Sequence, residues 1–317
     1  MNFRFAVLLL LFPIVATADE SKSRTFRFSY ETTVTGLKPD ETARIWLPIP
    51  QTTDDQEVTQ TSSHFPVQAK IGTEAEYGNR MYYLEPSADR NGKISLRVSY
   101  TVRRKEVRGE TNKSLMGDLS RFLKPDLLAP TDGKHNKLIE GKTLPMDPMA
   151  MAREFYDIVN GLMKYSKVGT EWGRGDVNWV CDNRFGNCTD FHSLFTALCR
   201  SQKMPALFEI GFGIPEKRGS GNVAGYHCWA KFRPANKGWV PVDISEANKN
   251  PKLTEYCFGN LSENRVTFTV GRAITLEPKQ DGPPLNFFVY PYVEVGGKVY
   301  SADKIAHTFA YEDIVTK

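Results

Sequence analysis

A cysteine, Cys188, stands where a helix would make its sulfur reactive, within the stretch FGNCTDFHSLFTALCR (185–200). Asn187 is a favoured N-cap residue, and Asp190 three residues later can complete a capping-box pair. The apolar residues that follow keep helical spacing: Phe191, Leu194, Phe195 and Leu198. Because a helix start carries unpaired N–H groups and a positive partial charge, it favours the thiolate. The spacing therefore indicates a candidate nucleophile.

A reactive thiolate needs a base to protonate the leaving group, and that base needs an orienting partner. His227 lies in GYHCWAKF, on a strand-like run over 226–234, and Asp243 lies in the next such run, GWVPVDIS (238–245). If these strands pair antiparallel with opposed residue numbers that sum to an even total, His227 and Asp243 share a face as neighbours. An odd register would put them on opposite faces.

The other histidines are weaker candidates for the base. His192 follows Cys188 by one helical turn and is the second choice, with capping or packing as its ordinary role. His64, His135 and His307 are assigned to surface positions. Alternation places Cys228 on the face opposite His227, which favours a buried core role for this thiol.

The N-terminal part of the chain predicts strands. The segments 25–34 and 94–102 alternate apolar and polar residues without a fault, and ARIWLPIP (43–50) reads as a third strand that ends at its prolines. We therefore expect residues 19–107 to form a small β domain whose default role is to pack against or shape its neighbour.

Four further segments complete the predicted organisation. Residues 108–146 read as a linker, and a helix opens at Asp147. The catalytic domain is predicted over 147–275, and it includes a glycine-rich loop, EWGRGDVNWVCDNRFGN (171–187), that leads into the nucleophile helix. Residues 276–317 are expected to form a C-terminal β extension.

The N-terminus has the pattern of a signal peptide. A basic residue (Arg4) precedes an apolar run over 5–15 and a small-residue site that ends at Ala18, which predicts a signal peptide over 1–18. The run is shorter than the roughly 20 apolar residues that a membrane span needs, so no membrane anchor is expected. The mature protein should be secreted or periplasmic. A net charge of +4 without basic runs argues against nucleic acid as a partner.

The chain has five cysteines: Cys181, Cys188, Cys199, Cys228 and Cys257. An odd number leaves at least one thiol free or paired with another chain, and the pairing stays open. A disulfide from Cys181 or Cys228 to Cys188 would mask the nucleophile.

Three stretches, GNCTDFHSLFTALCR, GYHCWAKF and WVPVDISEA, resemble in order and spacing the motifs of the transglutaminase-like superfamily, specifically its exported bacterial branch. The resemblance covers residues 145–275. It implies an α+β fold with a papain-like core, in which the nucleophile helix packs on an antiparallel sheet, here preceded by the small β domain. It implies Cys188 as nucleophile, His227 as general base and acid, and Asp243 as orienter.

The resemblance also implies a shared half-reaction, in which a thioester forms with a peptide or glutamine amide. Water as the acceptor gives a protease or amidase, whereas a primary amine gives a crosslinking transglutaminase. We expect hydrolysis of a peptide or protein substrate, because water is in excess and the sequence shows no acidic groove for an amine. The alternatives are the crosslinking enzyme and a non-catalytic binding or scaffold module of the same fold.

The oxyanion of such a reaction needs a hydrogen-bond donor. The backbone N–H of Cys188 is the expected donor, and Trp179 and Trp172 are the side-chain candidates that the resemblance suggests. Since the sequence has neither a D-x-D-x-D-G calcium loop nor a C-x-x-C pair, no metal and no other cofactor is expected. A metal-binding domain built from the cysteines and histidines is accordingly disfavoured.

Overall fold

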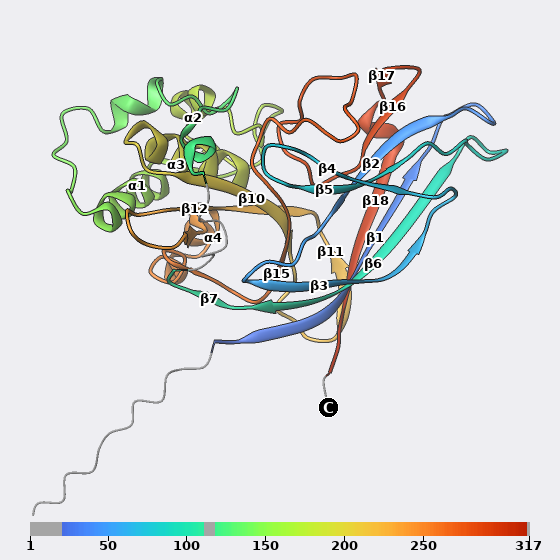
Figure 1. Cartoon of the computed structure of the whole chain (residues 1–317). Helices are drawn as coiled ribbons and strands as arrows, with labels where there is room; N and C mark the ends of the chain where they lie inside the picture. The colour runs from blue at the N-terminus through green and yellow to red at the C-terminus, as the bar shows by residue number, and fades with distance from the viewer. Residues whose placement is uncertain (1–20, 111–117, 316–317) are drawn as a thin grey trace, which may run out of the picture.

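The computed structural model describes residues 21–110 and 118–315 (Figure 1). The signal peptide predicted over residues 1–18 lies outside this part of the chain. The α-helices are α1 (Pro148–Leu162), α2 (Val177–Asn183), α3 (Cys188–Ser201) and α4 (Ile244–Lys249). Short 3₁₀ turns cover Ser120–Leu123, Lys134–Leu138, Pro251–Leu253 and Ala302–Lys304.

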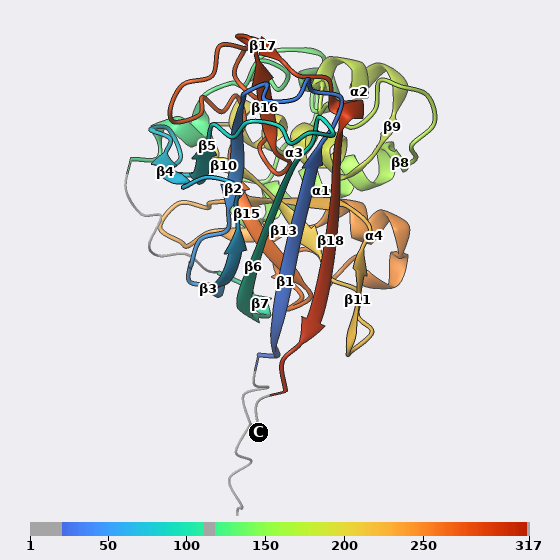
Figure 2. The ribbon, with the colours of Figure 1, turned by 90° about the vertical axis from the view of Figure 1, so that its right-hand side faces the viewer.

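Two five-stranded sheets combine N-terminal and C-terminal strands. The first has the order β11 (Ser220–Val223), β18 (Ile305–Asp313), β1 (Ser23–Val34), β6 (Ile94–Lys105), β3 (Gln56–His64), and these strands run side by side in Figure 2. The second has the order β17 (Lys298–Val299), β16 (Tyr292–Val295), β2 (Ala43–Ile49), β5 (Arg80–Leu84), β4 (Lys70–Thr73). The alternating segments predicted as strands, 25–34 and 94–102, lie in β1 and β6. The division of the chain into domains stays a prediction, and strands from 19–107 share both sheets with strands from 276–317.

The helices pack on a third, four-stranded antiparallel sheet. Its order is β13 (Val240–Val242), β12 (Tyr226–Phe232), β10 (Ala206–Gly213), β15 (Arg265–Val270). The apolar stripe predicted for α3 is buried against this sheet and against α1 in one core cluster that includes Phe195, Leu198, Phe155 and Phe232. Figure 1 shows α1, α2 and α3 gathered on one side of the molecule, away from the two five-stranded sheets. The protein is therefore an α+β fold in which a helix beginning at Cys188 packs on an antiparallel sheet, as predicted.

Two short strand pairs and one aromatic cluster complete the fold. Two short pairs join β14 (Asn260–Leu261) to β7 (Val107–Arg108) and, in parallel, β8 (Lys164–Tyr165) to β9 (Phe185–Gly186). An aromatic cluster links the first five-stranded sheet to the four-stranded sheet, with the Phe212 ring centroid 4.3 Å from that of Phe309 and 5.0 Å from that of Phe28. Large buried aromatic surfaces of this kind make the two sheets one packed unit. In the described ranges, no helix is long and apolar enough to cross a membrane.

Candidate active site

The start of α3 has the predicted capping arrangement. Asn187 is the N-cap, and its side chain accepts a hydrogen bond from the backbone N–H of Thr189 at 2.9 Å. The Asp190 carboxylate forms the second hydrogen bond of the capping box by accepting from the backbone N–H of Asn187 at 2.8 Å. Cys188 is therefore the first helical residue, and its own N–H belongs to the first-turn groups that have no acceptor within the helix.

Asp190 has a second role, since it also ties the glycine-rich loop to the helix start. Its carboxylate oxygens accept from the backbone N–H groups of Gly173 at 2.6 Å and Gly175 at 2.9 Å. A Cβ on Gly186 would lie 2.2 Å from Asp190 Oδ2. Gly186 is thus needed to make room for this buried carboxylate, and the loop over 173–175 is held beside Cys188.

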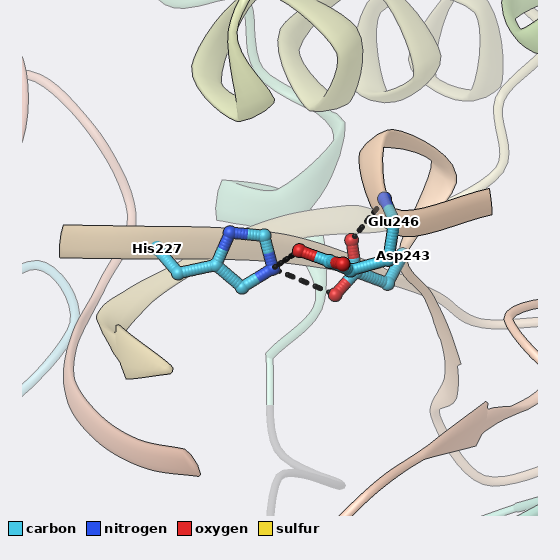
Figure 3. Close-up of side chains that lie close together, drawn as sticks. All are labelled: His227, Asp243 and Glu246. Atoms are coloured by element: carbon cyan, nitrogen blue, oxygen red, sulfur yellow. Dashed lines mark hydrogen bonds and ion pairs between the residues drawn. The ribbon is translucent and has the colours of Figure 1, made fainter. Parts of the chain in front are cut away.

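His227 and Asp243 meet across the hairpin of β12 and β13. Ala230 pairs with Val242, which is the even register, so the condition for His227 and Asp243 to share a face is met. His227 Nε2 lies 2.7 Å from Asp243 Oδ2, and Figure 3 shows the other ring nitrogen on the side away from the carboxylate. Since Nε2 is bonded to Asp243, Nδ1 is the nitrogen left to exchange a proton with Cys188.

Asp243 lies at the end of a strand that is shorter than predicted. The strand expected over 238–245 ends at Val242, and Asp243 is the N-cap of α4. Its Oδ1 accepts from the backbone N–H of Glu246 at 3.2 Å and from the Ser245 hydroxyl at 3.1 Å. The sequence pattern did not separate these two elements, because the apolar residues of a short buried helix and a buried strand look alike.

The electrostatics of the site favour a thiolate and an imidazolium. Burial alone would raise the pKa of the Cys188 thiol, but hydrogen bonds with Cys228 and His227 and the charge on His227 bring that pKa well below its ordinary value. Burial lowers the pKa of His227, yet the charge and hydrogen bond of Asp243, together with Cys188, raise it to about 10. At neutral pH the two groups form an ion pair.

The side chains of Cys188, Asp243 and His227 are shielded from solvent to different degrees. Cys188 is 2% exposed and Asp243 is 1% exposed, whereas the His227 side chain is 14% exposed. Neighbouring side chains therefore cover Cys188 almost completely. Exclusion of water also strengthens the ion pair, because charges interact more strongly at low dielectric.

His192 does not have the properties of the catalytic base. It is fully buried, burial lowers its pKa to about 4, and its Nε2 accepts a hydrogen bond from the backbone N–H of Ile244 at 3.1 Å. The ring is therefore neutral, and it holds the start of α4 next to Asp243. The surface position assigned to His135 is wrong, because this side chain is completely buried within its 3₁₀ turn.

Cys228 is buried, but it lies next to the site. Its Sγ is 3.6 Å from His192 Nδ1 and 3.8 Å from the Thr189 hydroxyl, and it shares a hydrogen bond with Cys188. All five cysteines are free thiols in the structure. Burial, followed by the neighbouring Cys188, raises the pKa of Cys228 well above its ordinary value. Cys228 is thus a protonated thiol that can donate to the Cys188 thiolate.

The two tryptophans proposed as oxyanion donors lie in different surroundings. Trp172 Nε1 donates to the backbone carbonyl of Gly169 at 2.8 Å, within its own loop. The Trp179 ring packs against Phe185, with 5.2 Å between the centroids, and contacts the helical core cluster. The N–H of Cys188 remains the donor whose position follows directly from the helix start.

One residue that the sequence did not single out contacts Asp243. Arg265, the first residue of β15, places NH1 3.2 Å from Asp243 Oδ2. Burial would raise the pKa of Asp243, but the charges of His227 and Arg265 hold it well below its usual range. No local pattern could have identified Arg265, because the contact depends on how two distant strands are arranged.

His227, Asp243 and Glu246 also form a group whose ligand atoms lie within 4.8 Å of one another, as a metal site would require (Figure 3). Asp243 Oδ2, however, already accepts from His227 and Arg265, and Lys249 forms an ion pair with Glu246. A cation would have to compete with these positive groups, so the donor set fits an imidazole–carboxylate pair better than a metal.

The protein thus has an α+β core in which a cysteine begins a helix, and a histidine and an aspartate meet at the adjoining hairpin. Residues 136–244 match the transglutaminase-like superfamily, and the chain therefore contains a transglutaminase-like superfamily domain. An uncharacterized protein of Haemophilus influenzae is 28% identical over 302 residues, with 80% of each chain covered.

One solved structure shows the same fold, and a second is a weaker match. A protein described as a putative cysteine protease from Cytophaga hutchinsonii has a TM-score of 0.59 and 16% identity, over 94% of both chains. A putative protease from Parabacteroides distasonis has a TM-score of 0.25 and 10% identity, over 68% of this chain and 46% of that one. The match to the Cytophaga protein includes the sheets outside the superfamily domain.

Proposed function

We propose that this protein is an exported, cysteine-dependent hydrolase that cleaves an amide bond of a peptide or protein through a thioester on Cys188. The observation that carries the proposal is the 2.7 Å contact between His227 Nε2 and Asp243 Oδ2, which leaves Nδ1 for the sulfur at the start of α3. The transglutaminase-like domain and the fold shared with the Cytophaga protein support it.

In the first half-reaction, the Cys188 thiolate attacks the amide carbonyl carbon, and the carbonyl oxygen takes up the negative charge. The N–H of Cys188 donates to this oxyanion. The His227 imidazolium then gives its Nδ1 proton to the departing nitrogen, the C–N bond breaks, and ammonia or an amine leaves. Asp243 keeps the imidazole ring in line and stabilises its charged form.

In the second half-reaction, neutral His227 takes a proton from water, and the resulting hydroxide attacks the thioester carbonyl. The C–S bond breaks, the acid product leaves, and the thiolate–imidazolium pair is restored. A primary amine in place of water would form a crosslink, which remains the alternative outcome of the same site. The export part of the proposal rests on the pattern of residues 1–18, and mass spectrometry of the mature protein should find Asp19 at its N-terminus.

The decisive experiment incubates the purified protein with a glutamine-containing peptide and with a denatured protein, each with and without a labelled amine. Ammonia release or chain cleavage without amine incorporation supports hydrolysis, whereas incorporated amine supports the crosslinking alternative. Both activities should be lost in Cys188→Ala and kept in Cys181→Ala, which removes a thiol outside the site. Turnover that survives Cys188→Ala would contradict the proposal.

A further inference from the structure

We propose that Arg265 is a positioning residue of this site, which holds Asp243 in its ionised form and aims its carboxylate at His227. The inference rests on the proposed roles of Cys188, His227 and Asp243. It adds a fourth residue, contributed by the far edge of the sheet, whose removal should alter the reactivity of the sulfur without any direct contact with substrate.

The geometry at Asp243 supports this role. Oδ2 accepts from His227 Nε2 at 2.7 Å and from Arg265 NH1 at 3.2 Å, so the two donors share one oxygen. The other oxygen is engaged at the start of α4. With the Arg265 side chain only 8% exposed, this hydrogen bond between two charged groups is formed away from water, where such bonds are strongest.

Arg265 reaches Asp243 across the width of the sheet. Its strand, β15, and the strand that precedes Asp243, β13, lie at opposite edges, with β10 and β12 between them. In the register of β10, Gly213 opposes Arg265 and Gly211 opposes His227. Since both residues are glycines, β10 contributes no side chain at the two positions that oppose Arg265 and His227.

The guanidinium is itself fixed on both sides. Its carbon lies 4.7 Å from the centroid of the Trp229 ring, and its Nε donates to the backbone carbonyl of Ser262 at 3.2 Å. Trp229 is completely buried, and its indole N–H donates to Glu209. An arginine stacked on an aromatic face and bonded at Nε has little rotational freedom, so it can hold a carboxylate in one orientation.

The contacts continue from Glu209 into the N-terminal strands. Lys231 Nζ lies 3.0 Å from Glu209 and 2.7 Å from Asp55, and all three side chains are buried. Asp55 directly precedes β3. A continuous set of buried polar contacts therefore joins Asp243, through Arg265 and Trp229, to the first five-stranded sheet, which explains how the N-terminal strands can support the site.

Arg265 acts among several other groups that face Asp243. His192 from α3 lies 3.8 Å from Oδ1, and Glu246 from α4 lies 3.7 Å from His227 Nε2. Further ionisable groups of the described residues that interact with the Asp243 charge are Tyr156, Tyr165, Cys228 and Cys257. Arg265 is the cation that touches the same oxygen as His227, so its loss changes the charge balance at that oxygen most directly.

The test measures, as a function of pH, the rate at which iodoacetamide alkylates Cys188. Mass spectrometry of the peptide that contains Cys188 quantifies the alkylation. Arg265 holds the Asp243 carboxylate against the imidazolium that stabilises the thiolate. Arg265→Met should therefore shift the acid limb of the profile to higher pH and slow alkylation at neutral pH by about tenfold or more. Arg265→Lys keeps the positive charge but lacks the planar guanidinium. The acid limb of its pH profile should therefore stay close to that of the wild type, and its alkylation rate should fall less than that of Arg265→Met.

Arg27→Met is the matched control, because Arg27 forms an exposed ion pair with Glu312 and should leave the profile unchanged. If Arg265→Met folds with a wild-type acid limb, the proposal is overturned. If Arg265→Met fails to fold, Arg265→Lys provides the test. An alkylation rate of Cys188 in Arg265→Lys equal to that in the wild type would overturn the positioning role. Alkylation needs no amide substrate, so failure of the proposed function appears separately, as a wild-type protein whose Cys188 is alkylated but which does not hydrolyse the amide substrates.

Discussion

Asp243 gives one carboxylate oxygen to His227 and the other to the start of helix α4. Oδ2 lies 2.7 Å from His227 Nε2, and Oδ1 accepts the backbone N–H of Glu246 at 3.2 Å. The strand that ends at Val242 and the helix that begins at Ile244 thus both fix the direction of this side chain. Asp243 is thus both the hydrogen-bond partner of His227 and the N-cap of α4, and substitution can separate these two interactions.

We predict that Asp243→Asn and Asp243→Ala differ in stability but share a loss of activity. Asparagine can still cap α4, whereas alanine should cost about 1 kcal/mol of unfolding free energy in addition. Both variants remove the charge that raises the pKa of His227, and amide hydrolysis should fall by about 10³- to 10⁴-fold. Urea unfolding and turnover of the same preparations check this. Equal stability of the two variants would contradict the capping role.

A second prediction uses the chain's own thiols as controls. The pKa of Cys188 lies well below the ordinary value, whereas burial raises the pKa of Cys181 to about 11. A thiol reacts as its thiolate, so brief iodoacetamide treatment at pH 6 should label Cys188 and leave Cys181 unlabelled. Raising the pH toward 10 should add label at Cys181. Preferential labelling of Cys181 at pH 6 would contradict the ion pair at the site.

Local features of the site could be predicted from the sequence. The helix start at Cys188 is specified by Asn187, Asp190 and the apolar stripe, which lie within one stretch. The meeting of His227 and Asp243 needed only the register of one hairpin, in which the alternation of neighbouring residues limits the choices. These elements depend on short-range patterns, so a single sequence contains the information.

Long-range features could not be predicted in the same way. Tyr30 on β1 pairs with Phe309 on β18, which lies near the other end of the chain, and Arg265 contacts Asp243 from the far edge of the sheet. Neither contact leaves a periodic or local signal. Buried charges such as Lys231 also look like surface residues in a sequence, because their partners become neighbours only when the sheets pack.

The third prediction concerns the buried charges that join the N-terminal strands to the four-stranded sheet. Lys231→Met would leave Asp55 and Glu209 buried without their shared cation, which should lower the free energy of unfolding by about 3–5 kcal/mol. Lys134→Met is the control, because its ion pair with Asp182 is exposed and should matter by less than about 1 kcal/mol. Similar urea midpoints for the two variants would show that the buried cluster does not hold the sheets together.

The fourth prediction follows from the neutral, buried His192. Its pKa is about 4 in the folded protein, against about 6.5 for an unfolded chain. Between these values the unfolded state binds a proton that the folded state does not, so this histidine's contribution to stability is full above pH 6.5 and is lost as the pH falls to 4.

The wild-type protein should therefore lose up to about 3 kcal/mol more unfolding free energy than His192→Gln over this pH range. Burial also lowers the pKa values of His135 and His307, but both proteins contain these residues, so their contributions cancel in the comparison. Urea unfolding at pH 4, 5, 6 and 7 measures how steeply the free energy of unfolding changes with pH in the wild type and in His192→Gln. Parallel slopes would mean that folding does not change the pKa of His192, and burial would then no longer distinguish His192 from His227 as the candidate base.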